Sequence, residues 1–151
     1  MAQVATKPSL KGRALRLLSQ REHSRKELEQ KLKPHEETPG ELAEALDFLV
    51  AKDFINEKRV VESVVNRRAS KLGAARVRQE LVAKGLPADD IAEAVDAMRS
   101  TELERAMQVW RKRFGTPPSD ASERAKQVRF LVSRGFAPEV VRRVVAGADE
   151  L

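Results

Sequence analysis

A segment of this chain recurs after 50 residues, and this internal repeat constrains the fold more than any other feature of the sequence. Gly85 and Gly135 occupy equivalent places in it, and residues 81–91 resemble residues 131–141. Each copy reads as a helix that ends at a glycine, a short turn and a second amphipathic helix, because glycine adopts the left-handed backbone that commonly ends helices. A fainter copy around Leu32 lies 49 residues before the middle one. Three copies at this period indicate a tandem array of helical units.

Helix boundaries follow from capping signals and from the spacing of apolar residues. Three Ser/Thr-x-x-Glu sequences, beginning at Ser24, Thr38 and Thr101, predict capping boxes, and Pro39 is expected to be the first residue of the third helix. The run 60–65 is rich in valine, but apolar residues four apart favour a helix over a strand. We therefore predict an all-α fold of nine helices, arranged as three tandem three-helix repeat units that form an elongated array. The predicted boundaries are a flexible tail at residues 1–9, unit 1 at 10–53, unit 2 at 54–99 and unit 3 at 100–151.

The composition fits such an array. Hydrophobic residues make up 41% of the chain but aromatic residues only 4%, so Leu, Val and Ala must form the core. The 34% of charged residues suits slim helices with solvated outer faces. There is no cysteine, as expected in a reducing cytoplasm, and no apolar run approaches the ~20 residues of a membrane span. We expect a cytoplasmic protein that does not associate with a membrane.

No group of residues points to catalysis, to a metal or to a cofactor. The two histidines, His23 and His35, are expected on the solvated surface, and no Cys/His/Asp spacing suits a metal ion. The seven glycines are scattered, so no glycine-rich loop could cradle a phosphate. Helical arrays offer extended surfaces to partners. We therefore expect neither enzymatic activity nor a bound cofactor.

The net charge of +6 favours an anionic partner, and basic residues gather at two places. These cations could contact phosphates or an acidic protein surface, or they could simply favour the negative ends of helix dipoles. Trp110 lies on an apolar stripe and is expected in the core, whereas Phe130 either fills a gap in the core or anchors a partner. The candidate partner-binding or nucleic-acid-binding residues are Arg67, Arg68, Lys71 and Arg76 in the first group and Arg111, Lys112, Arg113, Arg124, Lys126, Arg129 and Arg134 in the second.

Three sequence motifs occur in the order and spacing of a known family. They are His23-Ser24-Arg25-Lys26-Glu27-Leu28, Phe54-Ile55-Asn56-Glu57 leading to Arg67-Arg68-Ala69-Ser70-Lys71-Leu72-Gly73, and Arg129-Phe130-Leu131 with Arg134-Gly135-Phe136. With these motifs and its three-unit architecture, the chain resembles the RecX regulators of bacterial RecA recombinase over residues 10–146. The resemblance implies a non-enzymatic modulator that binds the RecA–DNA filament and suppresses its ATPase, co-protease and strand-exchange activities. It also implies a place in DNA repair, homologous recombination and the SOS response.

The sequence is compatible with two other functions. A stand-alone helix-turn-helix DNA-binding protein would need a recognition helix with exposed Asn, Gln or Arg, and the predicted fifth helix offers only Arg76 and Gln79. A protein–protein adaptor with incidental charge is also possible. The resemblance implies the RecA filament as partner. The net charge of +6, spread over the array, predicts weak and non-specific binding of single- or double-stranded DNA, and we expect a monomeric free protein.

Overall fold

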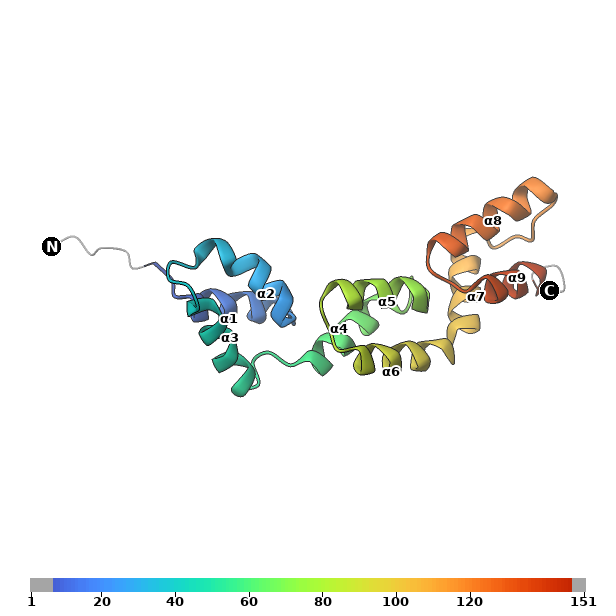
Figure 1. The fold of residues 1–151 in the computed structure, drawn as a ribbon. Coiled ribbons are helices and arrows are strands. Elements are labelled where there is room, and N and C mark those ends of the chain that lie inside the picture. The colour runs from blue at the N-terminus through green and yellow to red at the C-terminus, as the bar shows by residue number, and fades with distance from the viewer. Residues whose placement is uncertain (1–6, 148–151) are drawn as a thin grey trace. The chain divides into compact units, whose positions relative to one another are not determined.

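The computed structural model describes residues 7–147, and within that range the chain is helical, with no strand (Figure 1). It divides into two compact bodies, an N-terminal body (residues 1–60) and a C-terminal body (residues 61–151). The all-α fold predicted from the sequence is confirmed. The helices are α1 (Leu10–Gln20), α2 (Arg25–Leu32), the short 3-10 helix η1 (Lys33–His35), α3 (Glu41–Ala51), α4 (Glu57–Arg68), α5 (Ala74–Ala83), α6 (Ala88–Arg99), α7 (Glu102–Arg113), α8 (Ala121–Ser133) and α9 (Pro138–Gly147).

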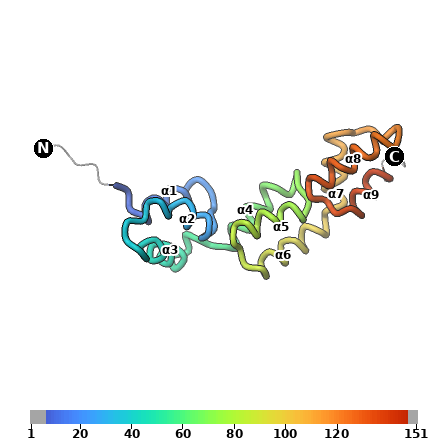
Figure 2. The backbone as a smooth tube through the Cα atoms, turned by 45° about the horizontal axis from the view of Figure 1, so that its top comes forward, coloured from blue at the N-terminus to red at the C-terminus, as the bar shows by residue number. Residues whose placement is uncertain are grey.

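The 50-residue repeat appears as two helix pairs, α5–α6 and α8–α9, and the helices of each pair pack against each other (Figure 2). Gly85 and Gly135 both have left-handed backbone, with φ of 74° and 90°. The same backbone hydrogen bond closes each turn, since the amide of Leu86 donates to the Leu81 carbonyl at 3.3 Å and the amide of Phe136 to the Leu131 carbonyl at 3.3 Å. The predicted repeat is therefore present in the backbone hydrogen bonding as well as in the sequence.

The valine-rich run forms part of α4, as the apolar spacing predicts. Val60, Val61 and Val64 are buried, while their polar neighbours lie outward. The Asn56 side chain accepts a hydrogen bond from the Arg59 amide at 3.0 Å and so caps the start of the helix. A helix places these three valines on one face, which a strand of the same sequence would not do.

Two of the three predicted capping boxes are wrong. Ser24 and Glu27 form one as predicted, with both reciprocal hydrogen bonds present. At the third helix, Gly40 is the N-cap with φ of 89°, so the helix begins at Glu41 rather than at Pro39. Thr101 makes no capping hydrogen bond: its hydroxyl donates to the Met98 carbonyl and accepts from the Arg105 guanidinium.

His23 lies in the interior of the N-terminal body rather than on the solvated surface. It is 1% exposed, and its Nδ1 donates to the Arg21 carbonyl at 3.0 Å. Its Nε2 accepts from the ammonium group of Lys31, also at 3.0 Å, so this network assigns a neutral imidazole. Burial lowers the pKa of His23. His35, by contrast, is exposed as expected.

The C-terminal body has an apolar core beneath α7, α8 and α9. Trp110 is 3% exposed in this core, as its position on the apolar stripe predicts. Its indole N–H donates to the side-chain oxygen of buried Gln127 at 2.8 Å, so the one polar atom of the ring is satisfied. The buried core residues are Ala106, Trp110, Leu131, Phe136, Val141, Val144 and Val145.

Candidate partner-binding groove

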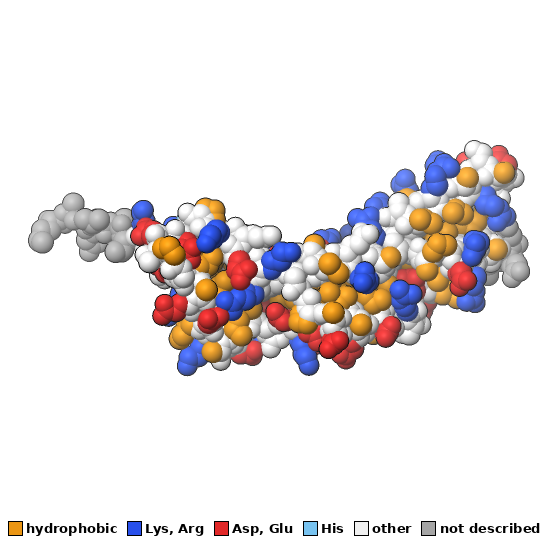
Figure 3. All heavy atoms as spheres, viewed as in Figure 1, with side chains coloured by type: hydrophobic (Ala, Val, Ile, Leu, Met, Phe, Trp, Pro, Cys, Tyr) orange, Lys and Arg blue, Asp and Glu red, His pale blue; other side chains and the backbone are white. Residues whose placement is uncertain are grey.

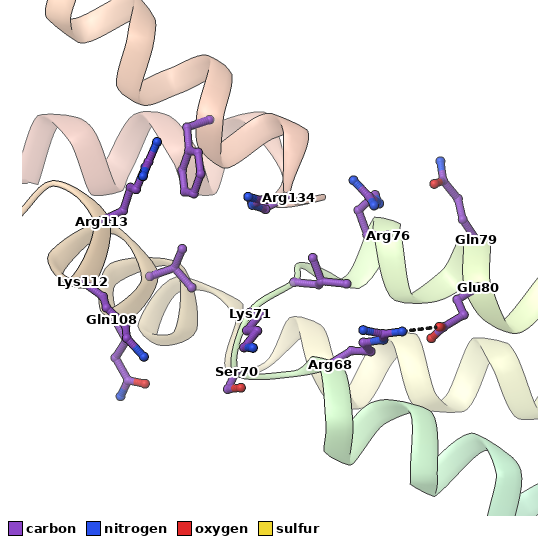
Figure 4. A pocket seen from close by; sticks show the side chains of 13 residues that line it. Arg68, Ser70, Lys71, Arg76, Gln79, Glu80, Gln108, Lys112, Arg113 and Arg134 are labelled. Carbon is purple, nitrogen blue, oxygen red and sulfur yellow. Dashed lines mark hydrogen bonds and ion pairs between the residues drawn. The ribbon is translucent and has the colours of Figure 1, made fainter. Parts of the chain in front are cut away.

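A groove of about 970 Å³ opens in the C-terminal body where α4, α5, α7 and α8 converge (Figure 4). We call it the basic groove, because six cationic side chains and a single carboxylate line it. Its charged residues are Arg68, Lys71, Arg76, Lys112, Arg113 and Arg134, with Glu80 as the one acid, and its other residues are Ser70, Leu72, Gln79, Gln108, Val109 and Phe130. A surface with this excess of cations favours an anionic partner.

Phe130 lies between two of these cations. The guanidinium carbons of Arg113 and Arg134 lie 5.1 Å and 4.8 Å from its ring centroid, within the range of a cation–π contact. Phe114 meets the same ring edge-on, with centroids 5.5 Å apart. Phe130 is half-buried and packs against the core while it lines the groove. The ring therefore holds the two arginine side chains in place at the groove wall.

Internal pairing neutralises little of the charge in the groove. Arg68 forms an ion pair with Glu80 at 3.1 Å, and this is the groove's only ion pair between described residues. The Arg68 Nε and the Glu80 Oε2 are buried and have no hydrogen-bond partner. Arg76 donates to the Ser133 carbonyl at 2.7 Å, a contact that leaves its charge intact. Lys71 and Lys112 are exposed, which leaves both ammonium groups accessible to a partner.

The structure brings together members of both sequence-predicted groups. Arg68, Lys71 and Arg76 come from the first group, and Lys112, Arg113 and Arg134 come from the second. The remaining candidates are exposed on α4, α7 and α8 but do not line the groove; they are Arg67, Arg111, Arg124, Lys126 and Arg129. Helix periodicity explains this separation for Arg111 and Lys112, since successive residues on a helix point in different directions.

The α4–α5 loop and the α8–α9 loop hold the two sides of the groove together. The Gly73 amide donates to the Arg134 carbonyl at 2.8 Å, and the Ala75 amide donates to the Gly135 carbonyl at 3.3 Å. The loops approach so closely that a Cβ atom on Gly73 would lie 2.3 Å from the Gly135 carbonyl oxygen. Sequence reasoning missed this contact, although Gly73 lies only two residues after Lys71, which lines the groove.

The acidic residues of the C-terminal body lie mostly away from the groove. On the face shown in Figure 3, acidic side chains gather along α6, whereas Lys and Arg side chains lie over α5 and α8. The acids of α6 are Asp89, Asp90, Glu93 and Asp96, and none of them lines the groove. Among residues 7–147, no cluster of His, Cys, Asp or Glu could hold a metal ion. No helix in that range is long and apolar enough to cross a membrane.

The fold and the site define a helical-repeat protein built from three tandem three-helix domains. Three family models match in order along the chain, described as the first three-helix domain of RecX at residues 11–49, the second at 56–95 and the third at 100–145. The chain belongs to the RecX family of regulatory proteins. This membership confirms the resemblance that the sequence motifs indicated.

Individual relatives agree with this assignment. The regulatory protein RecX of Leptothrix cholodnii is 58% identical over 141 residues, covering 93% of this chain and 90% of the relative. The regulatory protein RecX of Ralstonia nicotianae is 50% identical over 143 residues, covering 95% of this chain and 90% of the relative. A crystal structure of RecX from Lactobacillus salivarius superimposes with a TM-score of 0.77 at 21% identity, covering 94% of this chain and 96% of that one. The last comparison shows that the fold persists where most of the sequence has changed.

Proposed function

We propose that this protein is a modulator, mainly an inhibitor, of a RecA-type recombinase. In this proposal it binds the RecA–DNA filament and suppresses ATP hydrolysis, co-protease activity and strand exchange without catalysing a reaction itself. The observation that carries the proposal is the basic groove in a chain of the RecX family. Six cationic side chains and one carboxylate line this groove. Among the described residues, Arg68–Glu80 is its single ion pair.

The electrostatics favour docking on an anionic surface rather than enclosure of a small ligand. Lys71 and Lys112 project from a loop and from α7, and both are exposed, so a partner can reach them without rearrangement. Attraction between an anionic filament and this surface speeds encounter and weakens as salt screens it. Reversal of these charges replaces attraction with repulsion at the same place, which makes the groove testable by substitution.

Free DNA is expected to be a weaker partner than the filament. The net charge of +6 is spread over the whole chain, so binding should be nearly independent of sequence and should fall steeply with salt through release of counterions. We expect a monomeric protein that acts in the cytoplasm. An alternative role as a stand-alone DNA-binding protein would instead require tight, sequence-selective binding to a duplex near physiological salt.

The experiment is a titration of RecA ATPase activity on single-stranded DNA at increasing salt, with binding of free DNA measured in parallel. Because one bound molecule can block filament growth on which many protomers depend, inhibition should appear below one molecule of this protein per RecA protomer. Inhibition should also persist at a salt concentration that abolishes its binding to free DNA. If inhibition follows free-DNA binding in its dependence on both protein concentration and salt, competition for DNA explains the effect and the proposal is wrong.

A further inference from the structure

The first turn of α7 contacts both loops that border the basic groove. Glu102 lies in this turn, and it is one of the few buried charged residues, at 4% exposure. Its Oε1 accepts a hydrogen bond from the Ala74 amide at 2.7 Å, at the start of α5. Its Oε2 accepts one from the Ala137 amide at 3.2 Å, just before α9. One carboxylate therefore satisfies the free amides of two helix N-termini that lie 63 residues apart in the sequence.

Arg105, the next residue on the same face of α7, makes the complementary contacts to helix C-termini. Its Nη1 donates to the carbonyls of Ala69 at 3.0 Å and Leu72 at 2.8 Å, just after α4. Its Nη2 donates to the Met98 carbonyl at 2.8 Å, near the end of α6. Burial lowers the pKa of Arg105, and the charge of Glu102 opposes that shift, as expected for opposite charges that lie close together.

We propose that Glu102 and Arg105 are positioning residues that set the width of the basic groove. Together they fix the α4–α5 loop, residues 69–73, relative to the α8–α9 loop, residues 134–137. The inference rests on the proposed function only in treating this groove as the surface that binds the filament.

The link to the groove follows from which residues the two loops carry. Lys71 belongs to the first loop and Arg134 to the second, and both line the groove. Any change in the separation of the loops therefore changes the distance between cations that must meet the same partner. A preformed arrangement reduces the cost of ordering these side chains on binding.

Replacement of the Glu102 carboxylate by an amide would remove one of its two hydrogen bonds to backbone amides. Glu102 accepts two hydrogen bonds through two oxygens, whereas glutamine offers one oxygen and directs an N–H₂ group at one of the two backbone donors. Glu102→Gln conserves shape and size, so it removes the bridge without creating a cavity. Glu104→Gln makes the identical chemical change two residues along the same helix at an exposed side chain. It is therefore a matched control.

The separation of the two sides can be measured because the chain contains no cysteine. Val82 on α5 and Val132 on α8 are equivalent in the repeat and exposed, at 50% and 44%. Spin labels on Val82→Cys and Val132→Cys report the distance between these helices by pulsed electron paramagnetic resonance. In this doubly labelled background we expect one narrow distance distribution, unchanged by Glu104→Gln and clearly broadened or displaced by Glu102→Gln.

Filament inhibition measured with the same proteins separates this inference from the proposed function. We expect Glu102→Gln to raise the concentration needed for half-maximal inhibition by about tenfold, the equivalent of one hydrogen bond to a charged group. An unchanged distance distribution in Glu102→Gln would overturn the positioning role, whatever happens to inhibition. A changed distribution with unchanged inhibition would leave the positioning role intact and would instead contradict the assignment of the groove to the filament.

A second variant covers the case in which Glu102→Gln fails to fold. Arg105→Lys keeps the positive charge and most of the stem but loses the planar fork that reaches three carbonyls. We expect it to retain normal helical content by circular dichroism while it broadens the same distance distribution. A folded Arg105→Lys protein with a distribution as narrow as that of the unsubstituted chain would contradict the inference.

Discussion

Replacement of Gly73 by alanine should weaken the C-terminal body by forcing two loops apart. The backbone at Gly73 has φ of −80°, which any residue adopts, so strain in the backbone itself contributes nothing. The added Cβ would lie 2.3 Å from the Gly135 carbonyl oxygen and 2.5 Å from the Phe136 nitrogen. Both are backbone atoms, and ordinary contact begins near 3.4 Å, so the loops would have to separate by about 1 Å.

The loss of stability can be worked out from the backbone hydrogen bonds that this separation of the loops would break. The hydrogen bond from the Gly73 amide to the Arg134 carbonyl, now 2.8 Å, would stretch beyond hydrogen-bonding distance, and that from Ala75 to Gly135, now 3.3 Å, would be lost with it. Two such bonds contribute about 0.5–1.5 kcal/mol each, and overpacking of a close contact costs about 1–3 kcal/mol. We therefore expect Gly73→Ala to lower the free energy of unfolding by about 2–6 kcal/mol.

Urea denaturation followed by tryptophan fluorescence measures the free energy of unfolding of the C-terminal body. Trp110 is the only tryptophan, and it lies in the core of the C-terminal body, so its emission reports on that body alone. Gly147→Ala is the control, because no atom of the described residues lies within 4 Å of a Cβ at that position. It should be neutral or stabilising by at most about 1 kcal/mol, the helix-propensity difference between the two residues. A Gly73→Ala protein within about 0.5 kcal/mol of the unsubstituted chain would refute the reasoning.

Two further predictions concern the N-terminal body. Burial lowers the pKa of His23 below its ordinary 6.5. Below about pH 6.5 the unfolded chain therefore binds a proton at His23 that the folded chain does not bind. The stability of this body should therefore fall as the pH drops from about 7 to 5. His23→Gln should remove this pH dependence, whereas the control His35→Gln should retain it. Thermal unfolding measured at each pH checks both variants. Ser24→Ala should cost about 1 kcal/mol, since it leaves the Glu27 amide without its capping acceptor, and the same unfolding measurement at pH 7 checks it.

The sequence predicted the fold well because its strongest signals are local. A glycine at each repeat position is enough to end a helix, and apolar residues four apart are enough to favour a helix for α4. Two capping boxes failed, because Gly40 caps α3 and because the Thr101 hydroxyl bonds to Met98 and Arg105 instead. The sequence also did not predict the contacts of Glu102, whose carboxylate binds amides 28 and 35 residues away, because no local pattern specifies such a pairing.

The candidate site was only partly predictable for the same reason. Basic residues were correctly singled out in two stretches of sequence, but only the packing of α4, α5, α7 and α8 determines which of them face one groove. Lys112 lines it and the adjacent Arg111 does not, a distinction that depends on the rotation of α7 about its axis. The prediction for His23 was wrong because its burial depends on the packing of the N-terminal body, which its neighbours in sequence do not reveal.

Matched charge reversals inside and outside the basic groove test the proposed function most directly. The groove variant replaces Lys71, Lys112 and Arg113 by Glu, and these residues lie in the groove lining. The control variant replaces three exposed cations outside it, which are Arg111, Lys126 and Arg129. Both variants change the net charge by the same amount, so general electrostatic attraction to the filament falls equally in the two proteins.

The measurement is the concentration of each folded variant that halves the ATPase activity of RecA filaments. We predict that the groove variant requires at least about tenfold more protein than the unsubstituted chain, since three contact charges at about 0.5–1 kcal/mol each are reversed. The control variant should shift the same concentration by less than about threefold. A groove variant that inhibits as well as the control, with helical content and Trp110 fluorescence unchanged in both, would contradict the account.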